Sequence, residues 1–92
     1  MNAKRKGWRQ EDKARKILIK AGYDVFRSGG SFGIWDLIAC NQNGWRMIQV
    51  KTSYCCPADR ELLELYKAPP NTTKELWIFK DRVKEPIITI LK

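Results

Sequence analysis

The stretch GIWDLIACNQNGWRMIQVK, residues 33–51, decides the fold because it holds two apolar segments joined by a turn signal. Asn43-Gly44 is typical of a two-residue hairpin loop, since both central residues of a type I′ turn need a positive φ. Such a loop places Asp36 opposite Lys51, whereas a four-residue loop places Asp36 opposite Gln49. In both registers Asp36, Gln49 and Lys51 share one face, because side chains alternate along a strand.

Asp36 is flanked by apolar residues, which predicts a strand buried on both faces. An ordinary cross-strand ion pair with Lys51, worth roughly 0.2–1 kcal/mol, is one interpretation of the two charges. Burial of a carboxylate is costly unless it has partners or a function. The carboxylate, amide and ammonium of this hairpin therefore form a candidate site.

The composition predicts a single folded domain. The chain has 92 residues, 43% of them hydrophobic, and no apolar run approaches the roughly 20 residues of a membrane span. We expect a basic N-terminal arm over residues 1–6 and a single domain over residues 7–92. No signal peptide is evident, so a cytoplasmic location is expected, or the host-cell cytoplasm for a phage protein.

Positive charge is concentrated at the N-terminus. The net charge is +8, and residues 1–20 hold eight Lys or Arg against two acidic residues. This distribution predicts a polyanionic partner, most often nucleic acid, contacted by Lys4, Arg5, Lys6 and Arg9. A solvated basic face is the alternative interpretation.

Cysteine chemistry is disfavoured. The three cysteines lack a Cys-x-x-Cys spacing, and the chain has no histidine. Without these features a structural zinc site and a cysteine nucleophile with a histidine base are both unlikely readings of the sequence.

Residues 8–21 have the apolar spacing of a helix that Gly22 ends. Glu11 follows the same face as Ala14 and Leu18, so a carboxylate lies at one end of the face that packs on the sheet. A first-turn Glu stabilised by the helix dipole is the alternative.

The remaining elements complete an α/β fold with the order α-β-β-β-α-β-β, a mixed central sheet flanked by helices. Strands are predicted at 23–27, 76–79 and 86–91, the last at an edge because of Pro86. Pro57 suits the first turn of a second helix, closed by Pro69-Pro70. Its expected inner face comprises Ala58, Leu62, Leu65 and Tyr66.

Acidic residues beside a lysine on a basic protein indicate metal-dependent phosphodiester hydrolysis. Carboxylate and amide oxygens suit Mg²⁺, and Mn²⁺ can substitute. Such a cation generates hydroxide near neutral pH, and a neighbouring lysine offsets developing negative charge.

Asp36 followed by Gln49-Val50-Lys51 after a hairpin resembles the signature of the PD-(D/E)XK nuclease superfamily. Within it the chain is most similar to archaeal Holliday junction resolvases. Further local matches are Lys6-Gly7 ahead of Glu11, Arg27-Ser28 after the first strand, and Ser31 ahead of Asp36. The resemblance implies a restriction-endonuclease-like core.

The resemblance also implies residue roles. Asp36 would be the main metal ligand, Glu11 a metal-site carboxylate acting through water, and Lys51 the catalytic lysine. The backbone carbonyl of Val50 would complete the metal shell, and Arg27, Ser28 or Ser31 would contact DNA. Gln49 departs from the family, which usually has Glu or Asp there. Gln49 can still bind a metal through its amide oxygen, but it brings no charge.

The expected function is a Mg²⁺-dependent DNA endonuclease similar to a Holliday junction resolvase, with roles in DNA recombination and repair. A homodimer is expected, since two sites would cut two strands of branched DNA. Two alternatives stay open: a weak or inactive DNA-binding module of the same fold, and a small phage or mobile-element nuclease acting on nicked, flapped or duplex DNA.

Overall fold

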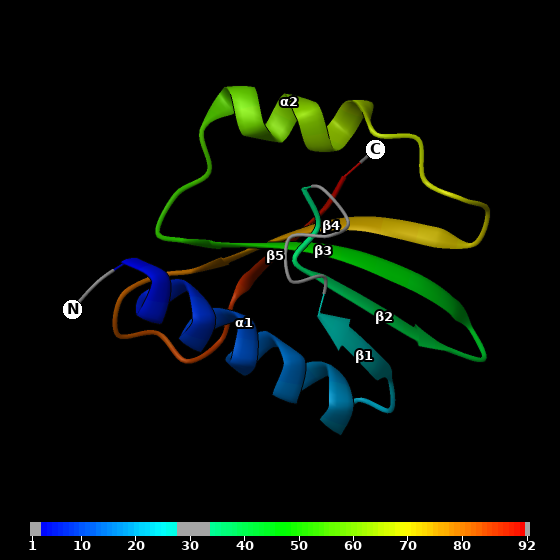
Figure 1. Ribbon diagram of the computed structural model, residues 1–92, viewed down its shortest axis with the longest axis horizontal. Helices are drawn as coiled ribbons and strands as arrows, with labels where there is room; N and C mark the ends of the chain where they lie inside the picture. Colours follow the sequence, from blue (N-terminus) through cyan, green and yellow to red (C-terminus); the bar gives the residue numbers. More distant parts are fainter. Residues whose placement is uncertain (1–2, 28–33, 92) are drawn as a thin grey trace.

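The computed structural model describes residues 3–27 and 34–91, and among them the side chains from Arg9 onward. Within these residues the chain runs α1 (Ala3–Lys20), β1 (Asp24–Arg27), β2 (Leu37–Asn41), β3 (Gly44–Thr52), α2 (Pro57–Leu65), β4 (Thr72–Phe79) and β5 (Ile87–Leu91). This is the predicted order of elements. α1 covers one face of the sheet and α2 lies over the other (Figure 1).

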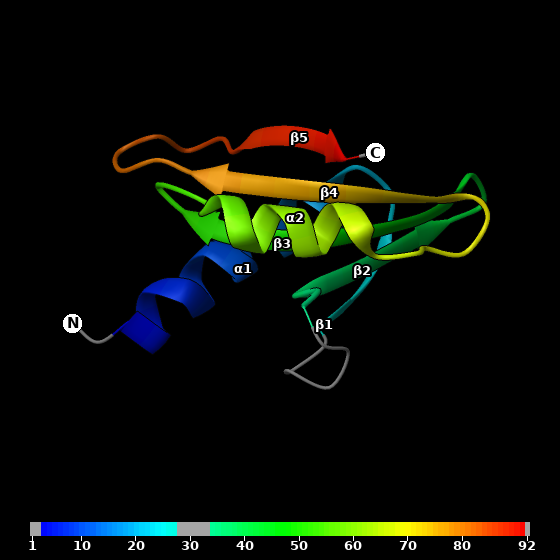
Figure 2. The same ribbon diagram turned by 90° about the horizontal axis from the view of Figure 1, so that it is seen from above.

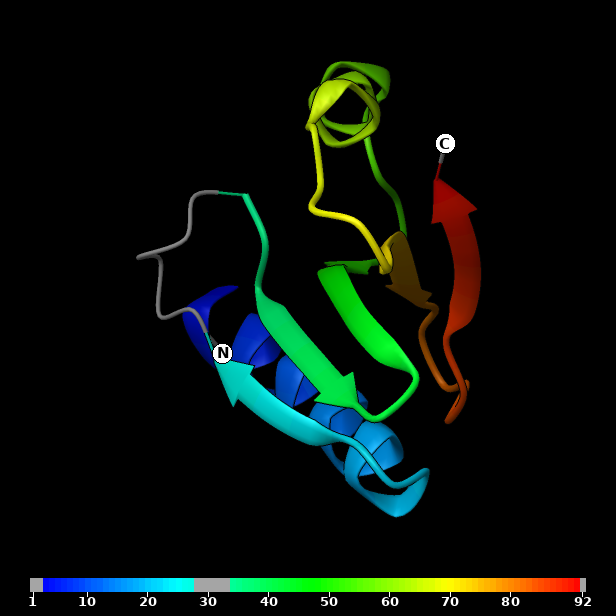
Figure 3. The same cartoon turned by 90° about the vertical axis from the view of Figure 1, so that its right-hand side faces the viewer.

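In the described part of the chain the sheet has five strands in the order β1-β2-β3-β4-β5. β3 and β4 are parallel and are joined by the crossover through α2, whereas the other neighbouring strands are antiparallel. Figure 3 shows the sheet between the two helices. The mixed α/β architecture predicted from the sequence is therefore confirmed, with β5 at an edge (Figure 2).

Helix α1 begins at Ala3 rather than at the expected Trp8 and ends at Lys20, next to Gly22 with its φ of +95°. Ala, Lys and Arg are strong helix formers, which explains the earlier start. As predicted, Ala14 and Leu18 are buried against the sheet. Their neighbours in this core cluster are Leu37, Ala39, Ile48, Val50, Trp77 and Phe79.

The tip of the β2–β3 hairpin differs from the preferred prediction. Asn41 pairs with Gly44, and the Asn43 N–H donates to Asn41 Oδ1 at 2.8 Å. The two-residue loop is therefore Gln42-Asn43, one position before the predicted Asn43-Gly44. The resulting pairing of β2 with β3 is the same as the pairing that was predicted for a four-residue loop. Gly44 belongs to β3 with a φ of +136°, and a Cβ on it would lie 2.5 Å from the Asn71 carbonyl oxygen.

Helix α2 presents a different face to the sheet from the one expected. Leu63 is buried in the second core cluster with Trp35, Met47, Leu76 and Leu91. Leu62, Leu65 and Tyr66 are exposed, as is Ala58. The expected inner face was therefore wrong, because apolar spacing alone could not reveal that Asp59 and Leu63 lie on the side facing the sheet.

The strand that follows Asp36 is buried on one face only, in contrast to the expectation. Leu37 and Ala39 are fully buried on the α1 side, whereas Ile38 on the α2 side is half-buried. Helix α2 leaves this part of the sheet open, so Asp36 can be reached from solvent.

Neither helix is long and apolar enough to cross a lipid bilayer, judged over the described residues.

Candidate active site

The β2–β3 ladder begins with the pair Leu37 and Ile48, and Asp36 immediately precedes it beside β3. The Asp36 N–H donates to the Ile48 carbonyl at 2.9 Å, and Leu37 then pairs with Ile48. Lys51 lies two residues beyond Gln49 and so on the same face of β3. The sequence-based expectation that these three side chains share a face is met through the alternative register.

These three residues line one cavity of about 180 Å³ on the α2 side of the sheet. The rest of its lining consists of Asp59 and three apolar residues, Ile34, Leu62 and Leu63. Asp59 was not anticipated from the sequence. A carboxylate in the first turn after Pro57 is a recognisable signal, but only the fold shows that this turn lies beside Lys51.

The Asp36 carboxylate is fixed by the backbone of the neighbouring strand. Its Oδ2 accepts the Val50 N–H at 2.8 Å. Burial raises the pKa of Asp36, while this hydrogen bond and the charge of Lys51 oppose the rise without cancelling it. The carboxylate is thus oriented, and its negative charge is only partly compensated by the described residues.

Gln49 provides the second indication of a missing partner. Among the described residues its buried side-chain Oε1 has no hydrogen-bond partner. Buried polar atoms are nearly always paired, so an unpaired amide oxygen on a residue that lines the cavity of Asp36 fits a cation or a bound water. The oxygen donors of Asp36 and Gln49 therefore fit a hard divalent cation.

Carboxylates are sparse around these donors. Across residues 3–27 and 34–91, no three or more His, Cys, Asp or Glu side chains come together as a metal-binding group. A cation held by one carboxylate and one amide carries less ligand charge than is usual for Mg²⁺ sites in proteins. The affinity of such a site for metal is expected to be low.

Glu11 is electrostatically coupled to Asp36 although it does not line the cavity. Burial raises the pKa of Glu11, the negative charge of Asp36 raises it further, and Arg27 lowers it. Glu11 lies on α1, one turn before the buried Ala14. The inward face predicted for Glu11 is therefore consistent with the structure, and its role toward a metal stays a prediction.

Lys51 is held by helix α2. Its Nζ donates to Asp59 Oδ2 at 3.0 Å. Burial alone lowers the pKa of Lys51, but the hydrogen bond and charge of Asp59, with smaller contributions from Cys55 and Asp36, raise it above its usual value. The lysine is thus a fixed ammonium at the edge of the cavity.

The residues expected to contact DNA are only partly described. Arg9 is exposed on α1. Arg27 donates to Asp12 Oδ1 at 3.4 Å, so its guanidinium is engaged within the protein. The side chains of Lys4, Arg5 and Lys6 lie outside the described part of the chain, as do Ser28 and Ser31.

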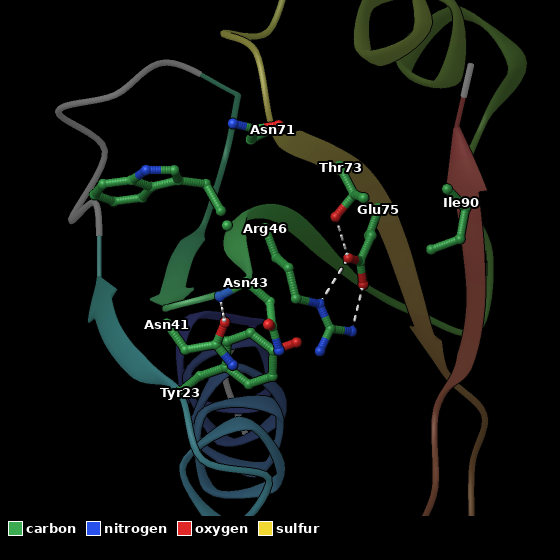
Figure 4. Close-up of a pocket in the computed structure, with 10 residues that line it drawn as sticks. Tyr23, Asn41, Asn43, Arg46, Asn71, Thr73, Glu75 and Ile90 are labelled. Carbon is green, nitrogen blue, oxygen red and sulfur yellow. Dashed lines mark hydrogen bonds and ion pairs between the residues drawn. The ribbon is translucent and has the colours of Figure 1, made fainter.

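A second polar pocket lies at the hairpin-tip end of β3, at the other end of the strand from Lys51. Arg46 makes two hydrogen bonds of 2.7 Å to the Glu75 carboxylate, and Thr73 donates to it at 2.6 Å (Figure 4). The Trp77 indole donates to the same carboxylate at 2.9 Å. These groups satisfy one another, which is typical of a structural network.

No protein-family model matches the chain, and no curated protein matches it in sequence. Among solved structures, the Holliday junction resolvase Hjc of Archaeoglobus fulgidus, an archaeal hyperthermophile, superimposes with a TM-score of 0.69. The two sequences are 22% identical, and the match covers 94% of this chain and 71% of that chain. The chain therefore has the fold of an archaeal Holliday junction resolvase.

Proposed function

We propose that this protein is a metal-dependent DNA endonuclease that hydrolyses phosphodiester bonds, similar in activity to a Holliday junction resolvase. The observation that carries this proposal is the convergence of Asp36, Gln49 and Lys51 in one cavity. The Gln49 amide oxygen, buried without a hydrogen-bond partner among the described residues, supports the proposal as a second oxygen donor beside Asp36.

In this proposal Asp36 and Gln49 hold Mg²⁺ or Mn²⁺, with Glu11 acting through water and the Val50 carbonyl as a further ligand. The bound cation would supply hydroxide near neutral pH and offset charge on the phosphate. Asp36 is already oriented for this task, because the Val50 N–H holds one of its oxygens. The raised pKa of Asp36, caused first by burial, favours an incoming positive charge.

Lys51 would stabilise the negative charge that develops on the phosphate as the bond to the leaving oxygen breaks. An ammonium is useful there only if it stays charged and in place, and the contact with Asp59 supports both conditions. DNA would be held through its phosphates by Arg9 and the basic residues that precede it. Two copies of the chain would present two cleavage sites to a branched substrate.

A second candidate function is a DNA-binding module without strong nuclease activity. It is favoured by the neutral Gln49 and by the absence, among the described residues, of a metal-binding group with three or more His, Cys, Asp or Glu side chains. Both candidate functions use the same DNA-binding surface, but only the nuclease cleaves DNA. Only an assay of cleavage separates them.

The test compares four DNA substrates in parallel: a four-way junction, a flap, a nicked duplex and an intact duplex. Each is incubated with Mg²⁺, Mn²⁺ or EDTA, with wild-type protein and with Lys51→Ala. We expect metal-dependent cleavage of the junction, and a loss of turnover rather than affinity in Lys51→Ala. Tight binding with no cleavage of any substrate in either metal would establish the binding module instead.

A further inference from the structure

Asp59 and Lys51 form an ion pair between helix α2 and strand β3. Lys51 lies near the end of β3, and Asp59 lies in the first turn of α2. Their charged atoms are 3.0 Å apart, and both side chains line the cavity that contains Asp36 and Gln49. The contact therefore connects the helix over the open face of the sheet directly to the proposed chemistry.

The position of Asp59 is set by packing one turn further along the helix. Leu63 follows Asp59 by four residues, so both side chains lie on the same face of α2. Leu63 is buried in the core cluster with Trp35 and Leu76, which fixes the rotation of the helix. Asp59 is thereby directed toward β3, whereas Glu61 on the same helix is exposed and does not line the cavity.

Lys51 depends on this one partner. Across the described residues, Asp59 is the only group to which Lys51 donates a hydrogen bond. A lysine side chain has four rotatable bonds, and ordering it costs rotamer entropy that a partner must offset. Without Asp59 the ammonium would sample solvent instead of remaining over the cavity.

The contact has little value as a stabilising element. The side chains of Lys51 and Asp59 are 28% and 46% exposed, and ion pairs at such exposed positions contribute little to the stability of a fold. Hydrogen bonds from Lys51 and then from Cys56 hold the pKa of Asp59 below its usual value, so its carboxylate stays ionised near neutral pH. A persistent charge that adds little stability to the fold is better explained by what it does to Lys51.

We propose that Asp59 is a positioning residue that holds the Lys51 ammonium over the cavity of Asp36 and Gln49. The proposal rests on the nuclease function proposed above, because it assigns to Asp59 a contribution to turnover. It names a residue on the crossover helix, outside the hairpin that carries the other candidate residues. The opposite role, in which Asp59 withdraws Lys51 from the substrate, predicts faster cleavage when Asp59 is removed.

The kinetic test uses single-turnover cleavage and DNA affinity in Asp59→Ala, Asp59→Asn and the control Glu61→Gln. Loss of an orienting partner typically costs 10–100-fold in activity, so we expect Asp59→Ala to slow cleavage by about that factor. Asp59→Asn keeps an acceptor and should fall between Asp59→Ala and wild type. DNA affinity and the Glu61→Gln control should stay close to wild type. Cleavage by Asp59→Ala at or above the wild-type rate would overturn the proposal.

A second measurement does not depend on cleavage. The ammonium signal of Lys51 is recorded by ¹⁵N NMR in the free protein without metal or DNA, and Lys51→Arg assigns it. We expect an ordered signal in wild type and in Glu61→Gln, lost through exchange or motion in Asp59→Ala. An unchanged signal in Asp59→Ala would show that Asp59 does not hold the lysine. Failure of wild type to cleave any DNA would instead count against the nuclease function.

Discussion

Two carboxylates of this protein, the buried Glu75 and the partly buried Asp36, have opposite environments. Glu75 is 1% exposed and accepts hydrogen bonds from Arg46, Thr73 and Trp77. Burial raises its pKa, but these donors outweigh burial, and the pKa of Glu75 lies below its usual value. Asp36 accepts one backbone N–H, and burial leaves its pKa raised.

The difference distinguishes a carboxylate that is fully compensated from one that the described residues compensate only in part. The network around Glu75 is complete, so nothing further is needed to keep that carboxylate ionised. Around Asp36 the described residues provide one hydrogen bond, and Gln49, whose amide oxygen has no hydrogen-bond partner among them, lines the same cavity. Such incomplete compensation is what a site for an added cation requires.

The largest expected effect comes from Asp36→Asn. The amide can still accept the Val50 N–H, but it removes the charge that would hold the metal. Loss of a direct ligand should cost at least the 10–100-fold that is typical for supporting residues, while DNA binding is retained. The thermal stability of the metal-free protein should stay equal or rise, because an under-compensated charge is gone. Cleavage at the wild-type rate would remove Asp36 from the site.

Glu75→Gln should show the reverse pattern. Breaking a buried ion pair typically costs about 3–5 kcal/mol, because the partner is left uncompensated. Arg46 is 22% exposed and can recover some hydration, so the lower end is expected. Urea denaturation measures this loss, and exposed Glu85→Gln is the matched control with a change within about 0.5 kcal/mol. Comparable stability of the two variants would refute a structural role for the Glu75 network.

The two carboxyls should also respond to pH in different windows. The pKa of Glu75 is lowered from 4.5, so its contribution to stability is present above pH 4.5 and is lost as the pH falls through its lower folded value. The pKa of Asp36 is raised from 3.8, so ionisation weakens the metal-free fold as the pH rises through the raised value.

The affinity for metal should depend on pH over the range in which Asp36 ionises. A cation must displace the proton of Asp36, so affinity for Mn²⁺ should fall by up to about tenfold per pH unit below the raised pKa. Calorimetric titration of the free protein between pH 4 and pH 7 measures this dependence. A pH-independent affinity over that range would mean that no carboxyl with a raised pKa binds the metal.

The smallest expected effect concerns Gln49. A carboxylate in its place adds the ligand charge that is usual in Mg²⁺ sites of proteins, so Gln49→Glu should lower the metal concentration needed by on the order of tenfold. Gln49→Ala should require more metal than wild type, without a change in the positions cut. If Gln49→Ala binds metal as tightly as wild type, its amide oxygen is not a ligand.

Much of the fold could be predicted because the hairpin and α1 carry local signals. Alternation placed Asp36, Gln49 and Lys51 on one face whatever the register, and helical spacing placed Glu11 with Ala14 and Leu18. The hairpin tip also contacts Asn71, a residue remote in sequence whose carbonyl lies against Gly44 and accepts the Trp45 N–H. Local turn chemistry could not reveal that contact, and it favoured the wrong loop.

Asp59 was missed for a related reason. The apolar pattern of residues 57–66 indicated a face that includes Leu62 and Leu65, but both are exposed. The rotation of α2 is decided by the packing of Leu63 against the sheet, and this contact is not encoded in the periodicity of the helix. A crossover helix with few buried residues is therefore hard to orient from sequence alone.

The contact between Gly44 and Asn71 has a consequence for how the protein tolerates mutation. The Trp45 N–H donates to the same Asn71 carbonyl at 2.9 Å, so the hairpin tip is tied to the start of β4. A methyl group at residue 44 would push this junction apart and loosen the alignment that sets Asp36 against Gln49. In a saturation screen for activity, residue 44 should therefore behave like a member of the cavity, although it lies at the opposite end of the hairpin.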